Sequence, residues 1–150
     1  MKQAGCPLCE SAGGDLVFEG AAFRVIRSDE GGFPAFYRVV WNEHVVELSD
    51  LAPADRALCL EAVVAVEQSL RAHLRPAKVN LASLGNLVPH LHWHVIARFD
   101  WDSHFPAPVW APAKREAPAS EVARVAALEP LLAADMVRKL STLAIAKRPR

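Results

Sequence analysis

Short apolar stretches along the chain predict a β-sheet. Leu16–Glu19 and Phe23–Ile26 have strand composition, and Gly20–Ala22 between them predicts a tight hairpin. The apolar positions of Phe36–Trp41 do not alternate cleanly, which favours a central strand covered on both faces. Lys78–Leu84 predicts a fourth strand.

Two other stretches have helical spacing. From Pro53 to Leu74 apolar residues recur every three or four positions, and Pro76 ends this helix. The resulting apolar stripe suits packing against a sheet. A second helical stretch runs from Ser120 to about Ile145, and Pro130 either divides it or begins a second short helix.

Three of the six histidines lie close together in the segment Pro89–Ile96. The residues around them suit a strand, in which alternate side chains point to opposite faces. His90, His92 and His94 would then share one face. The apolar residues of the other face would be Leu91, Trp93 and Val95.

Three interpretations of this histidine face compete. The histidines could be structural, with their hydrogen bonds satisfied inside the fold. Two of them in a His-x-His arrangement could bind a catalytic metal ion. Alternatively, one neutral imidazole could attack phosphorus while its neighbours orient it and handle protons.

The motif resembles the signature of the histidine triad (HIT) family, in which three histidines alternate with apolar residues and two further apolar residues follow. All seven positions match, from His90 to Ile96, and the similarity extends from about Cys6 to Trp110. The resemblance implies an α+β, HIT-like fold, with an antiparallel sheet of about five strands and one long helix packed on it. It also implies a homodimer.

Members of the family are nucleotide hydrolases and transferases that act at an α-phosphate. By resemblance, His92 would attack the α-phosphorus and form a covalent nucleotidyl intermediate, with a backbone carbonyl holding its other ring nitrogen. His94 would bond the phosphate oxygens and assist the leaving group. His90 would support the strand or bind zinc.

An N-terminal C-x-x-C motif, Cys6 to Cys9, indicates either half of a zinc site or a redox pair. A thioredoxin-like redox motif should follow a strand within a βαβ unit, and this motif lies too near the N-terminus for that. Some HIT proteins carry a similar motif, and the resemblance implies a structural zinc site made by Cys6, Cys9, His44 and His90. The alternative is two free thiols in a mobile terminus.

The resemblance also implies a substrate-binding set: Asn80, Gly85, Asn86, Arg98 and His104. Asn80 would contact ribose or phosphate, and Gly85 would let backbone N–H groups approach phosphate. Arg98 would neutralise phosphate charge or bond backbone carbonyls. His104, in an aromatic and polar loop, is either a fourth active-site histidine or a surface residue.

The sequence departs from the family pattern at two places. Asn86 and Leu87 stand where members with nucleotide activity often carry Gln and Ser or Thr; Asn86 keeps an amide donor with shorter reach, but Leu87 cannot replace a hydroxyl. Asn42–Glu43 replaces a basic pair, which removes positive charge near the expected phosphate site. These differences bear on substrate and rate more than on the chemistry.

Length and charge set further limits. The chain has 150 residues and a formal net charge of zero, so no global charge favours nucleic acid or an anionic membrane. We predict a HIT domain over residues 1–110, a proline-rich connector over 111–119 and a helical extension over 120–150. No apolar run is long enough to span a bilayer and no signal-peptide core is visible, which predicts a cytoplasmic protein.

These observations predict a nucleotide hydrolase or transferase that acts on a small-molecule nucleotide and needs no organic cofactor. Diadenosine polyphosphates and nucleoside phosphoramidates are the substrate types that the family suggests. The alternative is a zinc-stabilised nucleotide-binding or interaction protein with little catalytic activity, which Leu87 and the missing basic pair favour.

Overall fold

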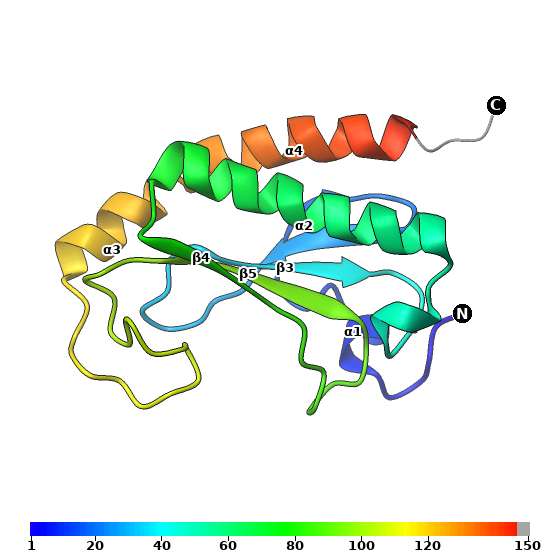
Figure 1. Ribbon diagram of the computed structural model, residues 1–150, viewed down its shortest axis with the longest axis horizontal. Coiled ribbons are helices and arrows are strands. Elements are labelled where there is room, and N and C mark those ends of the chain that lie inside the picture. The colour runs from blue at the N-terminus through cyan, green and yellow to red at the C-terminus, as the bar shows by residue number, and fades with distance from the viewer. Residues whose placement is uncertain (147–150) are drawn as a thin grey trace.

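The computed structural model describes residues 1–146 and contains one five-stranded antiparallel sheet (Figure 1). The strands are β1 (Asp15–Glu19), β2 (Phe23–Arg27), β3 (Phe36–Trp41), β4 (Lys78–Ala82) and β5 (His92–Arg98). Their order across the sheet is β1-β2-β3-β5-β4. The helices are α1 (Pro7–Glu10), η1 (Leu48–Asp50), α2 (Pro53–Leu74), α3 (Ala119–Ala126) and α4 (Glu129–Ala146).

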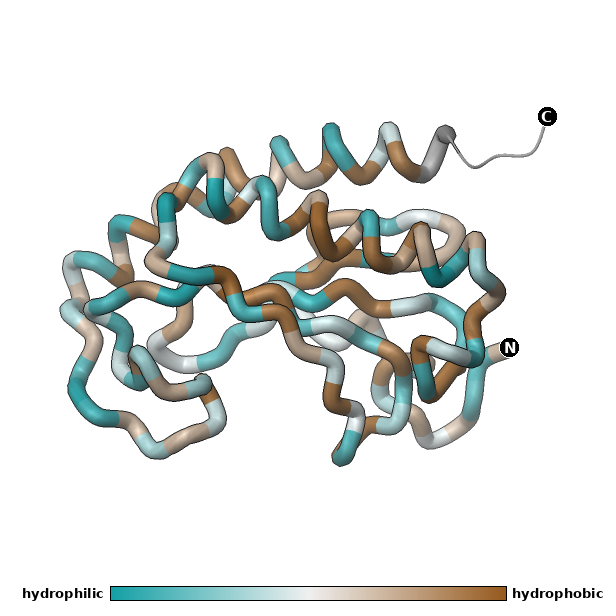
Figure 2. The backbone as a smooth tube through the Cα atoms, viewed as in Figure 1, coloured by the Kyte–Doolittle hydropathy of each residue, from teal (hydrophilic) through white to brown (hydrophobic). Residues whose placement is uncertain are grey.

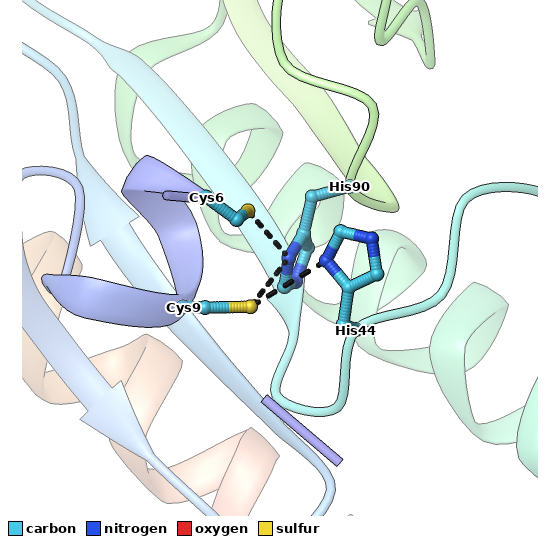
Figure 3. Close-up of side chains that lie close together, drawn as sticks. All are labelled: Cys6, Cys9, His44 and His90. Atoms are coloured by element: carbon cyan, nitrogen blue, oxygen red, sulfur yellow. Dashed lines mark hydrogen bonds between the residues drawn. The ribbon is translucent and has the colours of Figure 1, made fainter. Parts of the chain in front are cut away.

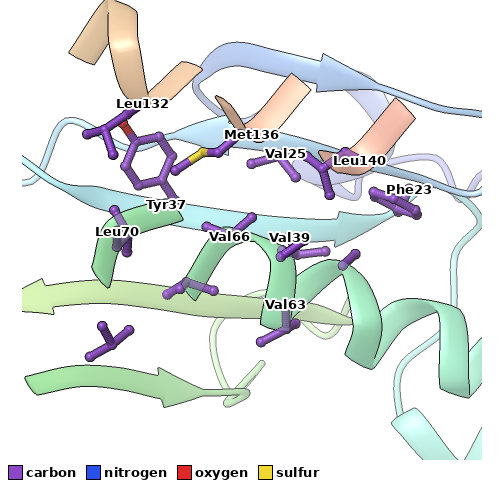
Figure 4. Close-up of a cluster of buried hydrophobic side chains, with 14 of the residues drawn as sticks. Phe23, Val25, Tyr37, Val39, Val63, Val66, Leu70, Leu132, Met136 and Leu140 are labelled. Carbon is purple, nitrogen blue, oxygen red and sulfur yellow. The ribbon is translucent and has the colours of Figure 1, made fainter. Parts of the chain in front are cut away.

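The long helix α2 covers one face of the sheet, and α4 packs beside it (Figure 1). The core between these helices and the sheet is apolar. It includes Phe23 and Val25 from β2, and Tyr37 and Val39 from β3 (Figure 4). The apolar segments of the sheet run through its central strands (Figure 2). The predicted α+β, HIT-like fold is confirmed.

Alternation along β5 divides its side chains between the two faces of the sheet. The apolar residues that pack toward the helices are Trp93, Val95 and Ala97. His92 and His94 lie on the opposite face, where β3 places Arg38 beside His94. The helices therefore bury one side of β5 and leave the histidine side for the loops.

Most predicted elements are confirmed, with small differences at their ends. The helix Pro53–Leu74 and the strand Phe36–Trp41 have the predicted bounds, and β3 is covered on both faces. The fourth strand ends at Ala82, two residues earlier than predicted. Pro130 lies in the first turn of α4, so it begins a second helix rather than dividing one, and this helix has 18 residues instead of being short.

The triad strand begins later than predicted, because His90 precedes it. The backbone N–H of His90 donates to the carbonyl of Val88 in a tight turn. Leu91 bridges the end of β3: its N–H donates to Val45, and its carbonyl accepts from Trp41. These bonds hold His90 at the entrance to β5, outside the ladder.

The last four residues of the predicted extension lie outside the described residues. Within residues 1–146, none of the helices combines the length and apolarity that crossing a bilayer requires.

Candidate functional site

The three histidines of the triad are all buried, with exposed fractions of 1% for His90, 8% for His92 and 6% for His94. The rings of His92 and His94 lie edge to face, 5.0 Å apart. His90 instead faces the N-terminal segment. The triad thus divides into a pair on β5 and a third histidine that belongs to a separate cluster.

The orientation of His92 is fixed by its own neighbour in the chain. Its Nδ1 lies 2.6 Å from the backbone carbonyl oxygen of His90. A carbonyl only accepts hydrogen bonds, so Nδ1 carries the hydrogen and Nε2 keeps its lone pair. Burial lowers the pKa of His92, and the charge of Arg38 lowers it further. His92 is therefore a neutral imidazole with an unprotonated Nε2, as a nucleophile requires.

His94 has the opposite arrangement of hydrogens. The Nε–H of Arg38 donates to its Nδ1 at 3.4 Å, so Nδ1 is the acceptor and Nε2 carries the hydrogen. Burial lowers the pKa of His94 to about 4, with contributions from His92 and Arg38. Trp110 from the loop after β5 reaches its ring, at 5.4 Å between centroids.

Sequence reasoning missed Arg38, which supplies a permanent positive charge next to the triad. Its guanidinium also donates to Glu30 at 2.8 Å. The signal was present, since Arg38 is the single charged residue in the otherwise apolar β3. A charged residue in a central strand needs a partner or a function.

Cys6, Cys9, His44 and His90 form a second cluster, at the N-terminal side of β5 (Figure 3). Their ligand atoms all lie within 4.8 Å of one another. His90 Nδ1 is 3.4 Å from the Cys6 sulfur and 3.5 Å from the Cys9 sulfur, and His44 Nδ1 is 3.5 Å from the Cys9 sulfur. These four residues could hold a metal ion.

The ring of His90 is oriented for such a role. Its Nε2 lies 2.6 Å from the carbonyl oxygen of Trp41 and therefore carries the hydrogen. Nδ1, the atom that faces the two sulfurs, is left with its lone pair. A metal-bound histidine commonly has its other nitrogen held by a backbone carbonyl in this way.

Arg24, also missed by sequence reasoning, anchors the segment that carries the two cysteines. Its guanidinium donates to the carbonyls of Leu8 (2.6 Å), Ala12 (3.0 Å) and Ser11 (3.2 Å). A fourth bond joins it to the Asn42 side chain at 3.1 Å. Only its place in β2 hinted at this role, because Arg24 lies between buried apolar residues.

Arg98 and Asn80, two predicted substrate-binding residues, bind each other and a carboxylate. Arg98 is 1% exposed and donates to both oxygens of Asp102, at 2.8 and 3.0 Å. It also donates to the Asn80 side chain and to the carbonyl of Ala107, each at 2.8 Å. Of the two predicted roles for Arg98, the structure shows the bond to a backbone carbonyl. Its charge is matched by Asp102.

The other predicted residues lie in loops. Gly85 has a φ of +78°, a conformation that favours glycine, and Asn86 after it is exposed. Leu87 is 97% exposed. His104 Nδ1 lies 2.8 Å from the Ser103 hydroxyl, and its ring is 5.1 Å from that of Phe33.

Comparison with solved structures gives close similarity to HIT proteins. A histidine triad protein from Bradyrhizobium japonicum has 26% identity and a TM-score of 0.66, over 84% of this chain and 91% of its own. One from Marinobacter aquaeolei VT8 has 27% identity and a TM-score of 0.66, over 88% and 96%. A zinc-bound histidine triad family protein from Mycobacterium smegmatis shares the fold at 19% identity, with a TM-score of 0.57 over 95% and 98%.

Comparison with curated protein sequences gives no match. The HIT domain family matches residues 11–101, which is more than half of the chain. This match includes His44 and the whole triad. On the family match and the shared fold, the chain belongs to the HIT family.

Proposed function

We propose that the protein is a nucleotide hydrolase or transferase that cleaves at an α-phosphate through a covalent nucleotidyl–histidine intermediate on His92. The observation that carries the proposal is the 2.6 Å bond from His92 Nδ1 to the His90 carbonyl. It leaves the Nε2 lone pair of a neutral imidazole free to attack, without a separate base.

The reaction divides into two displacements. His92 Nε2 forms a bond to the α-phosphorus while the bond to the leaving group breaks, and the leaving group takes the electron pair. His94, through its Nε2–H, donates a hydrogen bond to an oxygen that gains charge. Water, or another acceptor, then attacks phosphorus and the P–Nε2 bond breaks, with the electron pair returning to His92. The attacking group loses its proton to solvent, the nucleotide is released, and His92 is again neutral.

The test is AMP release from three compounds: diadenosine tetraphosphate, diadenosine triphosphate and adenosine phosphoramidate. We expect His92→Ala to lower the rate at least about a thousandfold, because no other group replaces the nucleophile. His73→Ala, at the far end of α2, is the matched histidine control. Circular dichroism checks that both variants fold.

Trapping gives a second measurement. Substrate labelled in its α-phosphate should transfer label to the wild-type protein and not to His92→Ala. Equal release by wild type and His92→Ala would contradict the nucleophile. Binding of AMP without any release would favour the alternative, a zinc-stabilised nucleotide-binding protein.

We propose that the metal of the cysteine–histidine cluster is zinc in a structural role. Two thiolates and two imidazole nitrogens are ligands that zinc prefers, and a tetrahedral zinc ion places sulfur and nitrogen ligands about 3.5 Å apart. The sulfur–nitrogen distances of 3.4 and 3.5 Å fit this value. The set provides four ligands, so it leaves no position for substrate.

We also propose that the protein acts as a homodimer in the cytoplasm on small nucleotides and not on nucleic acid. The zero net charge supports the choice of ligand. Three unpaired cysteines, Cys6, Cys9 and Cys59, suit a reducing compartment. Sedimentation velocity tests the homodimer, and cell fractionation tests the cytoplasmic location.

A further inference from the structure

Arg38 is the charged residue that approaches the histidine pair most directly. It lies opposite His94 in the β3–β5 ladder, and its side chain is 22% exposed. The ion pair with Glu30 holds its Nη2, while Nε points at the His94 ring. Its position is thus fixed from both ends of the guanidinium.

This contact limits how many protons His94 can hold. An arginine N–H occupies the side of the ring at Nδ1, and arginine stays charged at all working pH values. A second proton on His94, at Nδ1, would face the Nε–H of Arg38 and add a positive charge next to the guanidinium. Burial and neighbouring groups lower the pKa of His94 to about 4, in agreement with this geometry.

The other groups around His94 do not offset the charge of Arg38. His92 is its neighbour on β5, and β4 places Ala82 opposite it. The rings of Phe36 and Trp110 cover it at 5.6 and 5.4 Å. The nearby acid, Glu30, faces Arg38 rather than the imidazole.

We propose that Arg38 holds His94 as a hydrogen-bond donor that cannot act as an acid, so that the site takes nucleotides whose leaving group departs as an anion. Phosphoanhydrides and acyl phosphates meet this requirement, whereas phosphoramidates of alkyl amines do not. The inference rests on the proposed function and selects among its substrate types.

The chemistry follows from where the electron pair goes. When a phosphoanhydride is cleaved, the P–Nε2 bond to His92 forms, the P–O bond breaks, and a phosphate leaves with the pair. That oxygen is stable as an anion at neutral pH, and both His94 Nε2–H and Arg38 stabilise its charge. No proton has to move.

A phosphoramidate makes a different demand. Its P–N bond breaks with the pair on nitrogen, and an alkyl amine can leave only if that nitrogen receives a proton. The one proton on His94 cannot be given up, because an imidazolate would result. A doubly protonated His94 could supply it, but Arg38 opposes that form.

The experiment compares two substrates on the metal-loaded, full-length protein at pH 7. Diadenosine tetraphosphate has a phosphate leaving group, and adenosine 5′-(N-propyl)phosphoramidate has an alkyl amine. We expect the wild type to favour the first by about 100-fold or more in kcat/KM, the size of a typical general-acid contribution. Comparable rates would overturn the inference.

Arg38→Met removes the charge and keeps the length of the side chain. We expect it to slow cleavage of the anhydride and to reduce the preference at least about tenfold, because the positive charge that opposes a second proton on His94 is then removed. The matched control is Arg27→Met, which removes the exposed pairing of this β2 residue with Asp15 in β1 and should leave the preference unchanged. An unchanged preference in Arg38→Met would contradict the role of Arg38.

Nitrogen NMR of the histidine rings tests the same point without turnover. His94 should carry its hydrogen on Nε2 and should not titrate above about pH 5 in the wild type. In Arg38→Met its pKa should rise, while burial keeps it below the ordinary value. A wild-type His94 that titrates near 6.5 would overturn the inference. If neither substrate releases AMP, the proposed function fails, while the NMR result still decides whether Arg38 controls His94.

Discussion

Two segments outside the sheet lie on its face opposite α2, and buried polar groups hold each of them in a different way (Figure 1). The N-terminal strap, residues 1–12, carries Cys6 and Cys9 to the entrance of β5. The loop after β5, residues 99–118, carries Trp110 to His94. The strap is held where its two cysteine sulfurs meet two histidine nitrogens. The loop is held by a buried ion pair.

The loop is organised by Asp102, which is 1% exposed. Its two oxygens accept from Arg98 and from the backbone N–H groups of Phe99, His104 and Phe105. Burial alone would raise the pKa of Asp102, but these bonds hold it below its usual value. Charge and hydrogen bonds are therefore satisfied within the chain.

The two sulfurs of the strap, by contrast, lie next to the imidazole nitrogens of His44 and His90. Sulfur–nitrogen contacts of 3.4 to 3.5 Å are weak hydrogen bonds at best, and a cation between these atoms would replace them with strong bonds. The bonds of the loop are thus complete within the chain, whereas the strap, beyond its bonds to Arg24, carries two of four ligand atoms that could hold a metal ion.

The largest expected effect comes from breaking the buried ion pair between Arg98 and Asp102. Asp102→Ala leaves the buried charge of Arg98 without a partner, which typically costs about 3–5 kcal/mol of unfolding free energy. Urea unfolding followed by fluorescence measures this loss, and a chelator should not change it. Asp100→Ala is the control, since Asp100 is exposed two residues away. A loss below about 1 kcal/mol would show that the ion pair does not hold the loop.

Metal removal should have an intermediate effect. A ligand that binds only the folded state at a hundredfold excess over its Kd adds about 2.7 kcal/mol of stability. When a chelator removes the metal, this stability is lost, and the Tm of a chain of this size should fall by roughly 5–10 °C. Thermal unfolding with and without chelator measures it.

Cysteine variants sharpen this second test. Cys9→Ser should abolish the response to chelator. Cys59→Ala should keep it, because Cys59 lies in the core and burial raises the pKa of its thiol to about 11. A chelator response that persists in Cys9→Ser would exclude the four-residue cluster as its source.

The smallest expected effect concerns the residue that supports the strap without binding metal. Arg24→Met leaves the carbonyls of Leu8, Ser11 and Ala12 without their donor. Because only the bond to Leu8 is fully buried, we expect a cost of about 1–2 kcal/mol. It should also weaken metal binding, as measured by competition with a chromophoric chelator. Arg27→Met is the control, and equal metal affinity in the two variants would limit Arg24 to a role in stability.

Local patterns predicted most of the fold. Helix α2 and strand β3 have the predicted bounds, since proline positions and apolar spacing are local signals. The entrance to β5 was not predicted, because the ring of His90 is held outside the strand by its bond to the carbonyl of Trp41, 49 residues earlier in the chain. Such bonds between distant residues leave no trace in spacing.

The site, too, depends partly on local motifs and partly on contacts between distant residues. The cluster that gathers Cys6, Cys9, His44 and His90 was implied by resemblance, and the structure brings these residues together. Arg24 and Arg38 were missed. For Arg98 the sequence left two roles open, neutralising phosphate charge or bonding backbone carbonyls, and its bond to the carbonyl of Ala107 fits the second. An isolated arginine in an apolar strand does not reveal which side chain it will meet, because that depends on the register of the neighbouring strand.

The separation of the cluster residues along the chain has a consequence for the order of folding. Cys9 lies 35 residues before His44 and 81 before His90. Bringing such distant residues together costs closure entropy that only the assembled sheet can offset. An unfolded chain offers a metal ion two neighbouring thiols, and the imidazoles join them once β3 and β5 have paired. The ion should therefore bind late, after the sheet has closed, and it stabilises only chains that have reached that stage.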